Sequence, residues 1–333
     1  MSIRDRALGA LLGLAIGDAL GMPTQSFSRA EIAERFGVIT GLCDAPADQP
    51  IAPGMPAGSV TDDTEQALLV ADLLVAGGGR IDARAFAGAL RAWEARMIAR
   101  GSLDLLGPST KAALAAIAAG TDVAEAGRFG TTNGAAMRIT PVGIASPAGL
   151  PGSAGLLEAV VSASRVTHNP GWALSAAAAV AAAVSAGVDG APAARALTLA
   201  VAAARAGARL GHWEAGGHVA ARFEALRGPA RETGDFASFL DEVVGTSVHS
   251  QESVVAALLI VERYARRPFE GLCLAAAVGG DTDTIAAIAG AILGACAGAG
   301  AFPTDVRARV EAVNDLGLEL RVDALLGLRA AAP

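Results

Sequence analysis

The chain has 333 residues, of which 53 % are hydrophobic and 18 % charged, a composition that supports one large folded core. Its net charge is −7 and Lys111 is its only lysine, so it lacks the clustered positive charge that a nucleic-acid partner requires. Cys43, Cys273 and Cys296 are odd in number and widely spaced, which indicates neither a disulfide framework nor a zinc site and favours a reduced, cytoplasmic setting.

Two apolar segments resemble targeting or membrane sequences. Residues 1–21 combine arginines with a short apolar run, as a signal peptide does, but Asp5 and Asp18 bracket the run and no small-x-small cleavage site follows. The run 285–302 is uncharged and about as long as a membrane span. It consists mainly of Ala and Gly, which transfer weakly to lipid, so we predict a central buried helix and no membrane partner.

Helical periodicity dominates the rest of the chain. Segments with an apolar helical face are 64–77, 82–101, 109–120, 169–187, 191–211 and 250–268. We expect Ser109 or Thr110 to cap the third segment, and Asn169 to cap the fourth with Pro170 at its first helical position. No series of alternating strands and no βαβ unit is found. The predicted fold is all-α, with ten or so helices in a single domain over residues 1–330, and with loops at 37–58 and 145–155.

Two clusters of carboxylates and hydroxyls precede predicted helices in otherwise apolar sequence. They consist of Thr61, Asp62, Asp63 and Thr64 in the first cluster, and Asp281, Thr282, Asp283 and Thr284 in the second. Each cluster could simply cap its helix, because Asp and Thr oxygens accept hydrogen bonds from free N–H groups. One cap needs one acceptor, however, whereas each cluster offers two carboxylates, and four ionised acids in apolar surroundings would repel one another.

A shared cation site explains the excess of acids. Hard divalent cations take oxygen ligands, and four carboxylates are enough for two Mg²⁺ or Mn²⁺ ions, with Asp62 and Asp63 reaching different ions and Asp283 bridging them. The absence of nearby His or Cys in the sequence disfavours zinc. Spacing alone leaves both the capping and the metal interpretation open.

Further candidate site residues lie between the two clusters. Asn133 and Gly134 form a turn, and the small residues that follow could expose backbone N–H groups to a phosphate, although a plain turn into a helix is an equal alternative. His168 precedes a predicted helix, and Asp104 lies just before the turn at Ser109. A lone histidine is more often structural than catalytic, and a loop carboxylate is usually solvated.

The order of these motifs resembles the ADP-ribosylglycohydrolase family. The motifs are LLGLAIGDALGMPTQ, GSVTDDTEQALL, GPSTKAAL, NGAAMRITPVGI, THNP, ESVVAALLIVERY and GGDTDTIAAIAGAILGA, in that order over roughly residues 5 to 300. The resemblance implies an all-α fold with a cleft that holds a binuclear Mg²⁺ or Mn²⁺ centre. It also implies hydrolysis of the glycosidic bond of an ADP-ribosyl group, carried by a small molecule or by a protein.

The resemblance also implies roles for individual residues. The metal ligands would be Thr61, Asp62, Asp63, Asp281, Asp283 and Thr284. The substrate-binding residues would be Ser109, Asn133, Gly134, Ala135, Met137 and His168, with the loop 133–137 holding the diphosphate and the distal ribose. The metal-binding aspartates Asp62, Asp63 and Asp283 would also take part in the reaction.

One residue departs from the family pattern. Members that act on proteins commonly have a glutamate where this chain has Gln25, and glutamine can neither act as a general base nor carry charge to a metal. Gln25 could orient the attacking water or a ribose hydroxyl, and Asp104 is the candidate substitute acid. The alternatives are a nucleosidase-like hydrolase of small ribosides and a non-catalytic ADP-ribose-binding protein.

Overall fold

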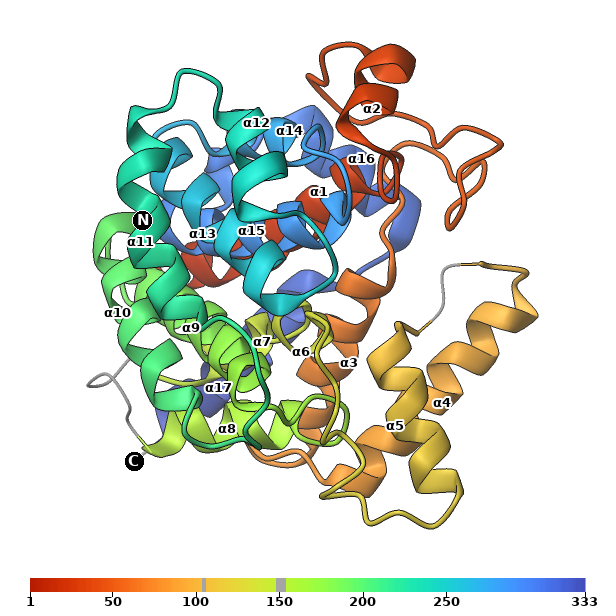
Figure 1. Cartoon of the computed structure of the whole chain (residues 1–333). Helices are drawn as coiled ribbons and strands as arrows, with labels where there is room; N and C mark the ends of the chain where they lie inside the picture. The colour runs from red at the N-terminus through yellow and green to blue at the C-terminus, as the bar shows by residue number, and fades with distance from the viewer. Residues whose placement is uncertain (104–105, 148–153, 333) are drawn as a thin grey trace.

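The computed structural model describes residues 1–103, 106–147 and 154–332. The chain is 66 % helical, and its described residues contain no β-strand, so the predicted all-α fold is confirmed (Figure 1). The α-helices are α1 (Ile3–Gly21), α2 (Arg29–Phe36), α3 (Asp62–Ala76), α4 (Ala83–Ala99), α5 (Pro108–Ala118), α6 (Gly134–Met137), α7 (Thr140–Ala145), α8 (Ala154–Ser164), α9 (Gly171–Val188), α10 (Ala193–Gly207), α11 (Val219–Glu232), α12 (Phe236–Phe239), α13 (Ser250–Tyr264), α14 (Pro268–Ala275), α15 (Thr282–Ala297), α16 (Thr304–Asn314) and α17 (Leu318–Ala331).

The described residues therefore form more helices than the ten or so expected. Several of the additional ones, such as α6, α7 and α12, have only four to six residues and are too short to show a helical period. A single large hydrophobic cluster extends from α1 to α17, and a small second cluster packs under the loop that follows α2. In Figure 1, α4 and α5 lie at the lower right edge of the bundle.

Two predicted helix starts are wrong by one to three residues. Helix α5 begins at Pro108 with Gly107 as its N-cap, so neither Ser109 nor Thr110 caps it. Helix α9 begins at Gly171 with Pro170 as its N-cap residue, so Asn169 does not cap it. The reason is the same in both places: proline is suited to the start of a helix because it has no N–H to leave unpaired, and it takes this position without a side-chain cap.

Helices α1 and α15 pack backbone against backbone along a line that we call the glycine seam. In α1 it consists of Gly9, Gly13, Gly17 and Gly21, one residue in every turn, and in α15 of Gly290, Gly294 and Ala286. A Cβ atom at Gly13 would lie 2.1 Å from the carbonyl oxygen of Gly290, and one at Gly21 would lie 2.4 Å from the Cα of Asp283. The seam therefore fixes the start of α15 directly against the end of α1.

Helices α9 and α15 form the apolar centre of the molecule. The prediction of a buried helix near 285–302 is confirmed, because α15 is buried from Thr282 to Ala295. Among the described residues, α9 is the one helix long and apolar enough by length and composition to cross a membrane, and all of it is buried inside the protein. Such an all-round apolar surface is typical of a core helix when other helices cover every side.

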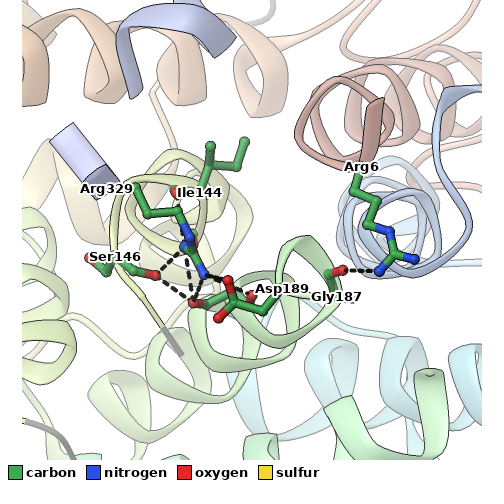
Figure 2. A network of polar contacts seen from close by, with 8 residues as sticks. Arg6, Ile144, Ser146, Gly187, Asp189 and Arg329 are labelled. Carbon is green, nitrogen blue, oxygen red and sulfur yellow. Dashed lines mark hydrogen bonds and ion pairs between the residues drawn. The ribbon is translucent and has the colours of Figure 1, made fainter. Parts of the chain in front are cut away.

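The C-terminal helix α17 is attached to the bundle by one buried cation. Arg329 is 6 % exposed, and its guanidinium donates to the carbonyl oxygens of Ile144 and Ser146 and pairs with the carboxylate of Asp189 at 2.5 Å (Figure 2). Asp189 directly follows α9, so this cluster joins the ends of α7, α9 and α17. The arrangement satisfies carbonyl groups that helix α7 leaves free at its C-terminus.

The loop 37–58 is irregular, as predicted, but it is packed against the end of α1. Gln49 is 2 % exposed, and its amide donates to the carbonyl oxygens of Met22 (3.4 Å) and Gln25 (3.0 Å). Residues 148–153 of the second predicted loop lie outside the described residues. The first loop thus holds the backbone of Gln25, which is one of the candidate site residues.

Candidate functional site

The fold brings the two carboxylate clusters together at the first turns of α3 and α15. The hydroxyl of Thr284 donates to the Oδ2 atom of Asp63 at 3.2 Å, although the two residues are 221 positions apart in the chain. Asp63 is 1 % exposed and Asp283 is 3 % exposed, while Asp62 and Asp281 are half-buried at the margin of the cluster. We call Asp62, Asp63, Asp281 and Asp283 the acid group.

The acid group does not cap its own helices by side-chain hydrogen bonds. Thr61 is the N-cap residue of α3 and Asp281 is the N-cap residue of α15, and neither side chain makes a capping bond. The simple capping interpretation therefore does not account for the excess of acids.

The cap of α3 is instead Asp18, a residue of α1 to which the sequence analysis assigned no role. Its fully buried carboxylate accepts from the backbone N–H groups of Thr61 (3.0 Å) and Thr64 (3.1 Å), and from the hydroxyls of Thr61 (2.8 Å) and Thr64 (2.5 Å). Because four donors meet one carboxylate, the first turn of α3 is fixed to α1. Asp18 thereby sets the position of Asp62 and Asp63. The hydroxyl of Thr61 donates a hydrogen bond to Asp18, so the lone pairs of the Thr61 oxygen point away from Asp18.

Burial and mutual repulsion disfavour ionisation of the acid group. Desolvation, followed by the charges of Asp283 and Asp62, raises the pKa of Asp63 well above its usual range. Desolvation and then the charge of Asp281 raise the pKa of Asp283 in the same way. Burial also raises the pKa of Asp281 to about 6. A bound cation would remove this penalty, because it replaces repulsion between carboxylates by attraction to a shared charge.

Three polar atoms at this place are buried without a hydrogen-bond partner. They are the Oδ1 atoms of Asp63 and Asp283 and the side-chain nitrogen of Gln25. Buried polar atoms in proteins are nearly always paired, so these two carboxylate oxygens are acceptors that the protein itself leaves unsatisfied. In the described part of the chain, no group of three or more His, Cys, Asp or Glu side chains is arranged to hold a metal ion as it stands. The donor chemistry, with carboxylates and threonine hydroxyls and no histidine or cysteine, fits a hard divalent cation such as Mg²⁺ or Mn²⁺.

The loop before α6 reaches the acid group from the other side. The amide nitrogen of Asn133 donates to Asp281 at 2.5 Å and to the hydroxyl of Ser253 at 2.9 Å. The hydroxyl of Ser109 accepts from the backbone N–H of Thr132 at 3.2 Å, so the candidate Ser109 lies against this loop. Gly134, Ala135 and Met137 are buried within α6. The fold therefore brings Asn133 into contact with the acid group, and it brings Ser109 into contact with the loop that carries Asn133.

His168 lies beneath this loop, without exposure to solvent. Its Nε2 atom is 2.9 Å from the hydroxyl of Thr132, and its Nδ1 atom is 2.8 Å from the hydroxyl of Thr167. A Cβ atom at Gly134 would lie 2.9 Å from the His168 ring, so glycine is needed there for the ring to fit. Burial, and then the charge of Arg138, lower the pKa of His168 well below its usual range, and the ring is neutral. This buried position indicates that His168 supports the loop and does not contact a ligand directly.

Two further residues, Asp104 and Arg138, differ in how they relate to the site. Asp104, the candidate substitute acid, lies outside the described residues. Arg138, which the sequence analysis passed over, is fully buried behind the acid group and is hydrogen-bonded to Gln66 of α3. The only sequence signal for Arg138 was an arginine directly after the apolar NGAAM stretch.

Known proteins match this chain over nearly its whole length. A family model described as ADP-ribosylglycohydrolase matches residues 1–332. YegU of Escherichia coli (strain K12) is 35 % identical, over 98 % of this chain and 97 % of that protein. The ADP-ribosyl-[dinitrogen reductase] glycohydrolase of Rhodospirillum rubrum is 28 % identical, over 98 % of this chain and 97 % of that protein. A solved structure of an "ADP-ribosylglycohydrolase-related protein complex" superposes with a TM-score of 0.70 at 27 % identity, and covers 98 % of this chain and 99 % of its own.

Proposed function

Because this chain belongs to the ADP-ribosylglycohydrolase family, we propose that it hydrolyses the glycosidic bond of an ADP-ribosyl group with the help of two divalent cations, Mg²⁺ or Mn²⁺. The ADP-ribosyl group is carried by a protein or by a small molecule. The proposed ligands are Thr61, Asp62, Asp63, Asp281, Asp283 and Thr284.

The observation that carries the proposal is the pair of unpartnered carboxylate oxygens on Asp63 and Asp283. A buried carboxylate that is ionised while one of its oxygens has no partner costs several kcal/mol. A purely structural role would not offset this cost, whereas a cation shared by the two carboxylates would. The neighbouring hydroxyl of Thr284, which already contacts Asp63, adds a further hard oxygen.

The proposed reaction is a simple exchange at the anomeric carbon of the ribose. The bond from this carbon to the leaving nitrogen or oxygen breaks, the oxygen of a water molecule takes its place, and a proton passes to the leaving group. When bound, the divalent cations lower the pKa of a coordinated water and fix ribose hydroxyls. One carboxylate of the acid group accepts the proton of the water, and Asn133, held between Asp281 and Ser253, borders the place of the ribose and diphosphate.

The presence of Gln25, where family members that act on proteins commonly have a glutamate, affects the rate of this reaction. Its side-chain nitrogen is buried and unpartnered, and its backbone is held by Gln49, so its amide can donate to the attacking water or to a ribose hydroxyl. An amide cannot accept a proton from water at neutral pH, so the acid group has to supply the base. A binding protein without turnover is the second candidate, and this unpartnered amide is the observation that favours it.

Hydrolysis assays with defined substrates test the proposal. The purified chain is incubated with ADP-ribosylated arginine and serine peptides and with plain nucleosides, with Mn²⁺ or Mg²⁺ and with a chelator. We expect cation-dependent release of ADP-ribose and its loss in Asp283→Ala. The matched control is Asp72→Ala, which removes a carboxylate of α3 that pairs with Arg321 at the surface. Full turnover by Asp283→Ala in the presence of chelator would refute the metal proposal. Binding of Mn²⁺ and ADP-ribose without any turnover would support the binding protein.

A further inference from the structure

A fully buried arginine lies between the acid group and the loop that precedes α6. Arg138 has no solvent exposure, and its side chain stacks on Phe86, with the Cζ atom 4.8 Å from the ring centroid. Its two terminal nitrogens donate in different directions, to Gln66 on one side and to Thr167 on the other. Burial lowers the pKa of Arg138 to about 10, while the charge of Asp62 opposes this shift, so the side chain stays charged at neutral pH.

One branch of the network leads from Arg138 to the acid group. The Nη1 atom of Arg138 donates to the Oε1 atom of Gln66 at 2.8 Å. The Nε2 atom of Gln66 donates to the Oδ2 atom of Asp62 at 2.8 Å. A guanidinium can only donate, so it fixes which end of the Gln66 amide faces it and directs the NH₂ group to Asp62. Arg138 thereby determines the orientation of an acid that it does not touch.

The other branch leads from Arg138 to the loop. The Nη2 atom of Arg138 donates to the hydroxyl oxygen of Thr167 at 2.6 Å. The proton of this hydroxyl has two possible acceptors, the Nδ1 atom of His168 at 2.8 Å and the carbonyl oxygen of Ser164 at 3.4 Å. The Nε2 atom of His168 lies 2.9 Å from the hydroxyl of Thr132, so in either tautomer the neutral ring joins the hydroxyls of Thr167 and Thr132.

We propose that Arg138 is a positioning residue that couples cation binding at the acid group to ADP-ribose binding at residues 132–138, which comprise the end of the loop before α6, α6 itself and Arg138. The segment that ends in Arg138 begins with Asn133, which holds Asp281 directly, so both halves of the acid group are tied to this loop. This inference rests on the proposed function, since it concerns the same two ligands.

The physical basis is the cooperativity of a buried hydrogen-bond network. Each member of the series Asp62, Gln66, Arg138, Thr167, His168 and Thr132 is hydrogen-bonded to the next, so an ordered arrangement at one end favours order at the other. A ligand that orders one end reduces the ordering cost for the second ligand. By linkage, each ligand then raises the affinity of the other by the same factor.

Two substitutions interrupt the series without altering charge or ligand contacts. Gln66→Leu removes the link to Asp62, and Thr167→Val removes the link to His168. The matched control is Thr140→Val, which deletes another buried threonine hydroxyl, one that has no hydrogen-bond partner. The folded fraction of each variant is checked by circular dichroism before titration.

The measurement is the coupling factor, defined as the Mn²⁺ affinity with saturating ADP-ribose divided by that without it, from calorimetric titration of the full chain. We expect the coupling factor of each single variant to be roughly fivefold or more below that of the wild-type chain. The double variant should lose no more than the larger single loss, because a series is interrupted by one break. Thr140→Val should stay within about twofold of the wild-type factor.

The possible results separate this inference from the proposed function. Wild-type coupling that both single variants retain, or losses that multiply in the double variant, would overturn the role of Arg138 while leaving the hydrolase proposal intact. A wild-type chain that binds both ligands without coupling would likewise overturn the role of Arg138 and leave the hydrolase proposal intact. A wild-type chain that binds neither ligand would overturn both proposals.

Discussion

Replacing Gly13 by alanine tests whether the glycine seam holds α1 and α15 in place. The new Cβ atom would lie 2.1 Å from the carbonyl oxygen and 2.7 Å from the carbonyl carbon of Gly290. Both atoms belong to the backbone, so rotation of a side chain cannot relieve the overlap. Ordinary contact begins at 3.4 Å, so the two helices would have to separate by more than about 1 Å along the seam.

The expected loss of stability is the difference between two effects. Alanine gains about 1 kcal/mol over glycine in a helix interior. Overpacking costs about 1–3 kcal/mol and occasionally more, and a seam of backbone contacts lies at the upper end of this range because several residues lose their contacts together. We expect a net loss of about 2 kcal/mol. For a chain of 333 residues this lowers the melting temperature by roughly 3 °C.

Differential scanning calorimetry of matched variants measures this difference. The control is Gly88→Ala in the middle of α4, where an added Cβ atom meets nothing within 4 Å. That substitution should stabilise the chain by about 0.5–1 kcal/mol through helix propensity alone. If Gly13→Ala raised the melting temperature as much as Gly88→Ala, the two helices would not be in backbone contact, and the geometry described for the start of α15 would be wrong.

Three further substitutions test other parts of the molecule. Asp18→Asn should lower the free energy of unfolding, measured by urea denaturation, by about 1–3 kcal/mol, because the new amide group places N–H donors of its own opposite four donors that need an acceptor. An unchanged midpoint would contradict the capping of α3 from α1. Arg329→Ala should lower the free energy of unfolding in the same assay by about 1–3 kcal/mol, whereas Arg4→Ala, which removes an exposed cation paired with the same helix, should cost under about 1 kcal/mol. Equal effects would argue against the anchoring of α17. Gln25→Glu should tighten Mn²⁺ binding by about tenfold in calorimetric titration through the added charge, and unchanged affinity would separate Gln25 from the cation site.

The acid group could be predicted because its signal is local in the sequence. Two carboxylates next to hydroxyls at the start of an apolar helix are unusual for either a cap or a core, and Asp62 and Asp283 attract notice for that reason. The prediction that the two clusters lie together rested on the interpretation that both hold one site, and the hydrogen bond from Thr284 to Asp63, 221 positions away, agrees with it. Their roles as ligands remain predictions.

Asp18 and Arg138 could not be predicted, because their partners come from distant elements. Asp18 occurs within the apolar helix α1, where a sequence pattern predicts only a misplaced charge, and its four donors belong to α3. Arg138 follows a four-residue helix, and nothing nearby in the sequence indicates that Gln66 and Thr167 will meet its guanidinium. The start of α5 was missed because a side-chain cap was given more weight than Pro108, whereas α9 begins one residue after Pro170, the residue predicted as its first.

The glycine seam has a consequence for how this chain is made. Helix α1 leaves the ribosome well before its partner α15, which is encoded about 270 residues later. At ordinary rates of synthesis, α1 waits roughly 15 to 60 s for that partner. During this time its apolar, small-residue surface is uncovered, and contacts between such distant segments form late in folding. Nascent chains of this protein would therefore depend on chaperones that cover α1 until translation reaches α15, and truncated chains that end before α15 should aggregate.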